Sequence, residues 1–319
     1  MEFIMPDMAT IDEFRAEWEN SLPYIVAHTS GSTGKPKQIR LLKSDMRRSA
    51  EATVERFSLG HNSVIGLPLS VDYIAGKMMC VRAWISGAEL VAMPVSNRLV
   101  IDRNYDLLAI VPSQVDSLID SGVKPSSCRN IIIGGAALDD RRRQMLSQRG
   151  FKCYQTYGMT ETCSHVALQD INDERKLYHA MPRISFSTDC RGCLVIVAPQ
   201  FSFGHIVTND IVELVDSHCF KWLGRYDNVI NSGGIKIAAE QLEEEIAPFI
   251  SCPFYITSMP DDKWGEVPVA VAQCDEEDCD AVLKRLVSNI DHRRCPKKII
   301  AVTHLEYTAN GKIIRKKLF

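Results

Sequence analysis

The sequence lacks the features that would point to a membrane, to nucleic acid or to export. Its 319 residues carry 37 lysines and arginines against 40 aspartates and glutamates, and this formal net charge of −3 gives no reason to expect a nucleic-acid partner. No apolar run reaches the roughly 20 residues that a membrane span needs. The first residues, MEFIMPDMATIDEF, are too acidic and too broken for a signal peptide. We therefore expect a cytoplasmic protein.

The cysteines lack the spacing of a metal site or of a disulfide framework. There are 11 of them, an odd number, scattered along the chain. Cys190 and Cys193 form one CxxC pair, but no second pair follows at the spacing of a zinc site. Without an export signal, reduced thiols are the expected state. We expect no metal at these cysteines.

The apolar pattern predicts an α/β fold with a largely parallel sheet. Strand-like runs at residues 24–29, 63–67, 88–93, 106–111 and 130–134 alternate with helical patterns. Ser44 is placed to cap one helix that Gly60 would end, and Gly87 is placed to end the next. Pro112 suits the first position of a further helix. The length is sufficient for a large core and two domains.

From about Cys193 onward, short strand-like runs replace this alternation. Residues 224–234 are polar and contain glycine, which indicates a hinge or loop. Helical patterns then follow at residues 239–246 and 282–290, with strand-like runs near residues 254, 267 and 299. We predict two domains, a large one over residues 1–226 and a small α+β domain over residues 227–319.

The stretch HTSGSTGKPKQIRL, residues 28–41, has the composition of a phosphate-binding loop. Glycines let backbone N–H groups approach a ligand closely, hydroxyls add donors and lysines add positive charge. It is not a Walker motif, because Thr29 stands in place of the first glycine and Pro36 follows the lysine. A flexible surface turn is the alternative. The candidate ligands are Thr29, Ser30, Gly31, Ser32, Thr33, Gly34, Lys35 and Lys37.

Six motifs in order resemble the adenylate-forming acyl- and aryl-CoA synthetase superfamily. They begin at the loop and continue to the C-terminus, so the resemblance spans nearly the whole chain. They are TSGSTGKPK at 29–37, IIIGGAAL at 131–138, YGMTET at 157–162, TND at 208–210, GRYDNVINSGGIKI at 224–237 and NGKIIRKKL at 310–318.

The resemblance implies an ATP-dependent ligase that works in two half-reactions. A carboxylate attacks the α-phosphate of ATP, giving an acyl-adenylate and pyrophosphate, and a thiol, usually that of coenzyme A, then displaces AMP. The implied cofactors are ATP, Mg²⁺ and CoA. The first step depends more on positioning and charge neutralisation than on covalent help from the protein.

The resemblance also assigns residues to the nucleotide. Thr160 would contact the α-phosphate and Glu161 would help to hold Mg²⁺, although a lone glutamate in such a loop is otherwise simply solvated. Tyr157 would stack on the adenine, or else be a core tyrosine. Asp210 and Arg225 would bind the ribose, or else form a surface ion pair. The remaining adenine-side residues are Gly135, Ala136 and Gly158.

By this resemblance, residues 1–226 would bind ATP and the acyl substrate, and residues 227–319 would be a mobile domain that carries a catalytic lysine. Lys312 would reach the carboxylate and the α-phosphate and stabilise the charge of the transition state; a basic tail is the alternative. Asp227 matches the hinge about which this domain would swing between the two half-reactions. Asn209 stands where the family has a glycine, and asparagine tolerates a left-handed turn. The loop that would face the thiol step contains Ser232, Gly233, Gly234 and Lys236.

Residues 67–91 resemble the acyl-substrate segment of o-succinylbenzoate–CoA ligases of menaquinone biosynthesis. Arg82 lies in an apolar helical pattern, and a buried arginine needs an anion, which a second carboxylate on the acid could supply. Alternatively, Arg82 reaches the surface or pairs with an internal carboxylate. Tyr73 could fill the place of an aromatic residue or histidine in that segment.

Only 28 residues precede the phosphate loop, where family members carry a sizeable subdomain. This is either a naturally short lineage or a chain that lacks its front, and a dimer partner could cover the surface that the subdomain would occupy. Besides an o-succinylbenzoate–CoA ligase, the sequence leaves open another aryl- or acyl-CoA ligase, an amino-acid-adenylating domain, or a nucleotide-binding protein without activity.

Overall fold

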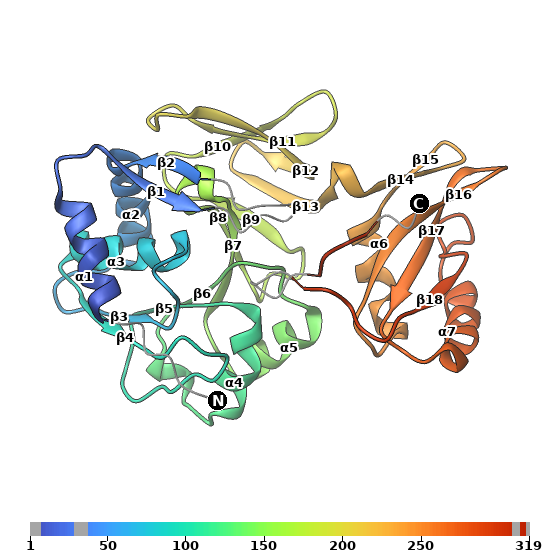
Figure 1. The fold of residues 1–319 in the computed structure, drawn as a ribbon, viewed down its shortest axis with the longest axis horizontal. Coiled ribbons are helices and arrows are strands. Elements are labelled where there is room, and N and C mark those ends of the chain that lie inside the picture. Colours follow the sequence, from blue (N-terminus) through green and yellow to red (C-terminus); the bar gives the residue numbers. More distant parts are fainter. Residues whose placement is uncertain (1–7, 29–37, 308–312, 317–319) are drawn as a thin grey trace. The chain divides into compact units, whose positions relative to one another are not determined.

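The predicted parallel strands form part of a large mixed sheet (Figure 1). The computed structural model describes residues 8–28, 38–307 and 313–316. Among these, eleven strands lie in the order β10-β11-β12-β13-β9-β8-β7-β6-β5-β3-β4. The strands from β4 to β7 pair in parallel, and β7 with β8, β8 with β9, and β9 with β13 pair antiparallel. Their bounds are β3 Val64–Leu67, β4 Glu89–Ala92, β5 Leu107–Ile110, β6 Ile131–Ile133, β7 Cys153–Gly158, β8 His165–Asp170, β9 Leu177–Ala180, β10 Ser185–Thr188, β11 Cys193–Ala198, β12 Gly204–Asp216 and β13 Cys219–Arg225.

Helices cover both faces of the parallel strands. Every residue of β5 and β6 is buried, as expected of apolar parallel strands enclosed between helices. Helices α2 and α3 pack on one another, and so do α4 and α5, with the two pairs on opposite sides of β3–β6 in Figure 1. The helix bounds are α1 Met8–Glu19, α2 Lys43–Phe57, α3 Ile74–Ser86, α4 Val115–Asp120 and α5 Asp140–Gln148.

A separate two-stranded ribbon flanks the predicted phosphate loop. Strands β1 Tyr24–His28 and β2 Gln38–Leu42 pair antiparallel from Tyr24 opposite Leu42 to His28 opposite Gln38. The nine residues that join them, 29–37, lie outside the described residues. The ribbon therefore fixes the positions at which the chain enters and leaves this loop.

The C-terminal part has its own sheet and its own hydrophobic core. The strand order is β15-β14-β17-β16, and β18 adds to β17 in parallel. Apolar residues of α6 and α7 pack with this sheet, among them Leu242, Ile246 and Leu286. The bounds are β14 Val229–Ser232, β15 Ile235–Ala238, α6 Ala239–Ile246, β16 Phe254–Asp261, β17 Gly265–Ala272, α7 Glu276–Asn289 and β18 Ile299–Ala301.

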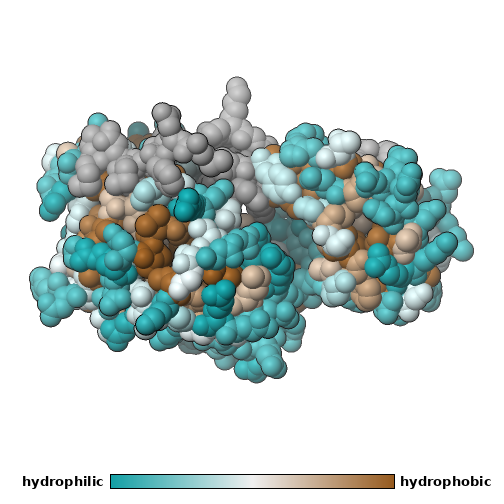
Figure 2. Space-filling model, turned by 90° about the horizontal axis from the view of Figure 1, so that it is seen from below, coloured by the Kyte–Doolittle hydropathy of each residue, from teal (hydrophilic) through white to brown (hydrophobic). Residues whose placement is uncertain are grey.

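By their contacts the residues divide into two units. The first comprises Met1–Phe186, Ile196–Ile206 and Val215–Lys221, and the second Ser187–Val195, Val207–Leu214 and Trp222–Phe319. The face shown in Figure 2 is mostly hydrophilic on both units, with apolar residues gathered in places. In the part of the chain that the structure describes, no helix is long and apolar enough to cross a membrane.

Three local expectations were wrong. Helix α2 begins at Lys43 after Leu42, so Ser44 lies inside the first turn and does not cap it. The same helix ends at Ser58, whose left-handed backbone (φ 52°) closes it two residues before Gly60. The expected loop at residues 224–234 contains strand β14. Gly87 does end α3, with φ 70°.

Candidate active site

The carboxyl ends of β5, β6 and β7 form the edge of the sheet where ligands bind in α/β folds. These strands are parallel, so the residues that follow them gather at one edge. Gly135 and Ala136 follow β6, with Gly135 exposed and at φ 88°. Gly158 ends β7, and a Cβ there would lie 2.4 Å from the carbonyl oxygen of Ser164. The backbone at this edge thus needs glycine and offers open peptide groups.

Tyr157, on β7, is half-buried and held by other aromatic rings. Its ring meets Tyr178 and Phe220 edge-on, with centroids 5.7 and 5.2 Å away. Phe186 also packs on Phe220. This packing fixes the plane of the tyrosine while part of it remains accessible. Tyr157 therefore belongs to an aromatic cluster, and its stacking on adenine stays a prediction.

The turn after β7 presents Thr160 and Glu161. Thr160–Thr162 forms a 3₁₀ turn in which Thr162 Oγ1 accepts from the backbone N–H of Met159 (3.0 Å). Cys163 follows with φ 62°. Glu161 is exposed and Thr160 half-buried. No group of three or more metal-binding side chains occurs among the described residues, and Mg²⁺ usually needs only one or two carboxylates beside phosphate oxygens. A single Glu161 suits that role.

The predicted ribose residues lie together in the second unit. Asp210 is buried, and its Oδ1 accepts a hydrogen bond from Trp222 Nε1 (3.2 Å) and lies 3.5 Å from Arg225 Nη1. Arg225 Nη2 also lies 3.4 Å from Asp227 Oδ2. Asp210 and Arg225 therefore form an ion pair, as in the alternative, although Asp210 is buried and not on the surface. Their binding of the ribose stays a prediction.

Asn209 does not need the left-handed turn that was expected. It lies within strand β12, and the described non-glycine residues with positive φ do not include it. Its side chain accepts from Arg191 Nη1 (3.1 Å) and donates to Asp227 Oδ2 (3.3 Å). The backbone is extended there, so the conformational freedom of the family's glycine is not needed at this position.

The predicted hinge and the thiol-step loop both lie in the second unit. Asp227 sits in the 3₁₀ turn Tyr226–Asn228 between β13 and β14. The backbone turns from β14 into β15 through Gly233 and Gly234, with φ 57° and 84°, as a two-residue hairpin turn requires. Ser232 is buried at the start of this turn, and Lys236 is exposed after it.

Arg82 is enclosed on α3 without a carboxylate partner. Its relative exposure is 2%, and no ion pair joins it to a carboxylate within the described part of the chain. Burial lowers the pKa of its guanidinium to about 9, and its buried Nε has no hydrogen-bond partner. The surface position expected as one alternative for Arg82 is therefore wrong, and an internal ion pair, the other alternative, does not occur among the described residues. Tyr73, before the same helix, is 43% exposed and does not share this environment.

Comparison with known proteins agrees with this geometry. The sequence matches the family model of the AMP-binding enzymes over residues 8–190. The chain belongs to the AMP-binding enzyme family. The predicted family and α/β fold class are confirmed.

Relatives of this AMP-binding enzyme include a 2-succinylbenzoate–CoA ligase of Listeria monocytogenes, 26% identical over 96% of this chain and 72% of that protein. A solved acyl-CoA synthetase (AMP-forming)/AMP-acid ligase II-like protein from Dyadobacter fermentans is 33% identical, covers 97% of this chain and 92% of that one, and has a TM-score of 0.65. The o-succinylbenzoate coenzyme A synthetase of Bacillus subtilis, solved with ATP and magnesium, shares the fold at 19% identity, with a TM-score of 0.76 over 91% of this chain and 68% of that one.

Some predicted residues of the AMP-binding enzyme lie outside the described residues. They are Thr29, Ser30, Gly31, Ser32, Thr33, Gly34, Lys35, Lys37 and Lys312. Their roles stay predictions.

Sequence reasoning missed the residues that surround Arg82. Thr53 lies on α2, Ser164 precedes β8 and His165 begins it. Ser164 and His165 follow the YGMTET motif after a single intervening residue, Cys163, and this closeness was the one available signal. Thr53 reaches His165 because α2 lies beside the start of β8, and no local sequence pattern reveals that contact.

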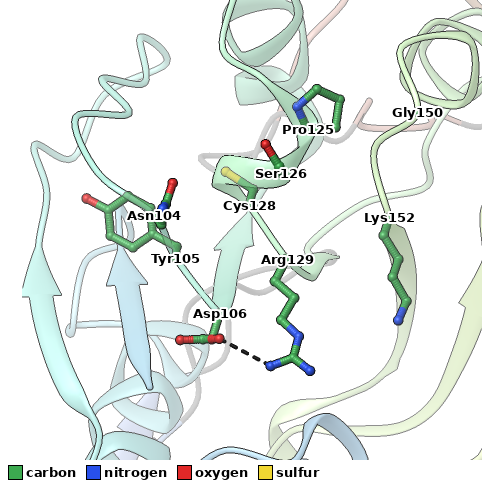
Figure 3. A pocket seen from close by; sticks show the side chains of 9 residues that line it. All are labelled: Asn104, Tyr105, Asp106, Pro125, Ser126, Cys128, Arg129, Gly150 and Lys152. Carbon is green, nitrogen blue, oxygen red and sulfur yellow. Dashed lines mark hydrogen bonds and ion pairs between the residues drawn. The ribbon is translucent and has the colours of Figure 1, made fainter. Parts of the chain in front are cut away.

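A pocket of about 420 Å³ lies at the other edge of the parallel strands (Figure 3). Its lining comes from the residues just before β5, β6 and β7. Arg129 and Asp106 face one another there, 3.5 Å apart, and Lys152 points into the same space. This pocket is separate from Gly135 and Gly158, which lie at the carboxyl ends of the same strands.

Proposed function

We propose that this enzyme is an ATP-dependent acid–CoA ligase that converts 2-succinylbenzoate into 2-succinylbenzoyl-CoA. The observation that carries the choice of acid is Arg82, a buried cation whose described partners are all neutral. A buried charge without a counter-charge is costly, so the site favours a ligand that brings a carboxylate. 2-Succinylbenzoate has two: one to be activated and one on the ring. The relatives named as ligases of this acid support the choice.

In the first half-reaction the succinyl carboxylate attacks the α-phosphorus of ATP, and pyrophosphate leaves. Thr160 donates a hydrogen bond to the α-phosphate, and Lys312 stabilises the charge that develops on it. Glu161 would hold Mg²⁺, which neutralises phosphate charge when bound. Tyr157 and Gly135 orient the adenine, and Asp210 accepts hydrogen bonds from the ribose hydroxyls.

In the second half-reaction the sulfur of CoA attacks the acyl carbon and loses its proton. The C–O bond of the mixed anhydride breaks, and AMP leaves with the bridging oxygen that came from the carboxylate. We propose that a backbone change at Asp227 brings the turn at Gly233 and Gly234 into use for this step. A Cβ at Gly234 would meet nothing, so the backbone there is open to a ligand, whereas Gly233 lies against the ring of Trp264. Lys236, exposed after the turn, supplies a cation for the phosphates of CoA.

The test measures pyrophosphate release with ATP, Mg²⁺ and 2-succinylbenzoate, with and without CoA. We expect Lys312→Ala to lower kcat by about a hundredfold or more, the usual loss of one transition-state donor. Arg82→Ala should raise the KM of the acid by about 30-fold, the equivalent of roughly 2 kcal/mol, while the KM of ATP changes little. Arg129→Ala, in the pocket at the other edge of the sheet, is the matched control and should behave as wild type.

Different results would redirect the proposal. If wild type binds ATP but releases no pyrophosphate with this acid, the choice of substrate is wrong, and a panel of aryl, acyl and amino acids identifies the substrate. If no acid in that panel supports pyrophosphate release, the chain is a nucleotide-binding protein without ligase activity.

A further inference from the structure

Neutral groups surround the guanidinium of Arg82. Its Nη2 donates to Ser164 Oγ (2.5 Å) and lies 3.5 Å from His165 Nδ1. Its Nη1 lies 3.3 Å from the sulfur of Met79, one turn earlier on α3. On its far side the imidazole of His165 contacts Thr53 Oγ1 on α2 through Nε2 (3.3 Å).

The hydrogen-bond directions assign the tautomer of His165. Thr53 Oγ1 donates its single hydrogen to the carbonyl oxygen of Ser49, 3.1 Å away. It can therefore only accept from His165, so the ring proton sits on Nε2. Nδ1 is then a lone-pair acceptor, and it faces Arg82 Nη2 and the hydroxyl of Ser164 (3.3 Å). Nδ1 of His165 and Oγ of Ser164 therefore both present acceptor atoms to Arg82.

The histidine does not carry a charge of its own. Burial lowers the pKa of His165 well below 6.5, and the nearby Arg82 lowers it further. The four side chains Thr53, Ser164, His165 and Arg82 thus hold a single positive charge among them. A carboxylate at any of the three neutral positions would neutralise the arginine, and this sequence has none there.

We propose that Thr53, Ser164 and His165 are positioning residues that fix the Arg82 guanidinium while leaving its charge uncompensated, and so select acids with a second carboxylate. This rests on the proposed function, because it concerns how the same site distinguishes its acid. Neutral acceptors orient the guanidinium through hydrogen bonds, whereas an internal carboxylate would orient it and also remove the attraction for the ligand's anion.

The decisive comparison is His165→Asp against His165→Asn. The two side chains have the same shape, and either can place an oxygen near the position of Nδ1, but only aspartate adds a negative charge. Each variant is assayed with 2-succinylbenzoate and with 4-oxo-4-phenylbutanoate, which has the same chain without the ring carboxylate. The readouts are kcat and KM for each acid, together with the KM of ATP.

We expect His165→Asp to lower the preference for the diacid, as a ratio of kcat/KM values, by about tenfold or more relative to His165→Asn. The change should appear in the KM of the diacid, with its kcat and the KM of ATP nearly unchanged. Equal losses in the two variants, or equal losses with the two acids, would overturn the proposal, because a merely structural role predicts them.

A second pair keeps the test decisive if the aspartate variant does not fold. Thr53→Val removes the acceptor that anchors His165, and Thr53→Ser keeps it. We expect the valine variant to raise the KM of the diacid about threefold to tenfold and the serine variant to restore it. Identical KM values for valine, serine and wild type would overturn the proposal. Absence of turnover by wild type with both acids would instead refute the proposed function, which separates the two failures.

Discussion

Asp210 gathers two positively polarised groups on one carboxylate oxygen. Trp222 Nε1 donates to Oδ1, and Arg225 Nη1 lies 3.5 Å from the same atom. Replacing the carboxylate by an amide keeps the shape but loses the charge and one acceptor. We expect Asp210→Asn to raise the KM of ATP by about tenfold, and to leave the KM of the acid unchanged.

The control for this change is Glu213→Gln, an exposed carboxylate on the same strand, β12. Isothermal titration with a non-hydrolysable ATP analogue gives the affinity directly. Equal affinities of the two variants for the ATP analogue would show that Asp210 does not bind the nucleotide.

Single residues were predictable from sequence where a motif or an improbable pattern singled them out. Arg82 was found because a cation in an apolar helical pattern needs an explanation. Thr53 and His165 were not found, because their importance comes from contacts across 112 residues of sequence. Asn209 was assigned a turn from the family pattern, whereas its strand pairing gives it an extended backbone.

Helix α6 and the C-terminal motif are joined by a largely buried ion pair. Arg315 pairs with both carboxylate oxygens of Glu243, at 2.6 Å for Nη2 and Oε2, and also donates to the carbonyl of Ile256 (3.1 Å). Arg315→Ala leaves Glu243 without its counter-charge. We expect a loss of about 3 kcal/mol in the free energy of unfolding at pH 7, measured in urea.

The same pair predicts a pH dependence. Burial raises the pKa of Glu243 above its ordinary 4.5, although Arg315 opposes this. The folded protein therefore holds this proton more tightly, and the carboxyl's contribution to stability falls as pH rises above 4.5 toward the folded-state pKa. Without Arg315 the pKa rises further, so the variant's deficit should be smaller at pH 4 than at pH 7.

Lys316→Ala is the control for this series, because Lys316 pairs with Glu306 at an exposed position. It should change stability by less than about 0.5 kcal/mol. If the Arg315→Ala deficit were the same at both pH values, the charge of Glu243 would not be its cause.

Helices and strands were predicted best where a residue with a known preference for helix or strand ends marks their boundary. Gly87 ended α3 as expected, because only a left-handed residue closes the helix there. At the end of α2 the left-handed residue is Ser58, and the conformational preference of serine does not predict this. Strand β14 was missed because Val229 and Ile230 are flanked by polar residues and glycines, and its pairing partners β15 and β17 follow later in the chain.

We expect the two half-reactions to need different backbone angles at Asp227, and a substitution there tests this. Asp227 lies in the second position of a 3₁₀ turn, where the φ of proline is acceptable. Asp227→Pro locks that angle. We expect one half-reaction to persist within about threefold of wild type and the other to fall by at least tenfold, because each would need a different backbone angle.

Acyl-adenylate formation and its transfer to CoA are measured separately by pyrophosphate release and by thioester formation from isolated adenylate. Asp227→Ala, which leaves the backbone free, should slow neither step by more than about threefold. Equal losses of both steps in the proline variant would argue that residue 227 is not the hinge.

The predicted domain division at residue 226 stays a prediction. Grouping by contacts begins the last segment of the second unit at Trp222 but adds two earlier segments, because β11 and β12 contribute residues to both units. Composition and apolar periodicity are read along the chain, so they cannot reveal a unit that is assembled from separate segments.

The parallel strands of the first unit have different features at their two ends. Gly135 and Gly158 stand at the carboxyl ends, while the pocket beside Arg129 and Lys152 opens at the amino ends (Figure 3). A small molecule lodged in that pocket would leave a nucleotide at the other edge undisturbed. An inhibitor found there should therefore lower the maximal velocity at every ATP concentration, and raising ATP would not relieve it.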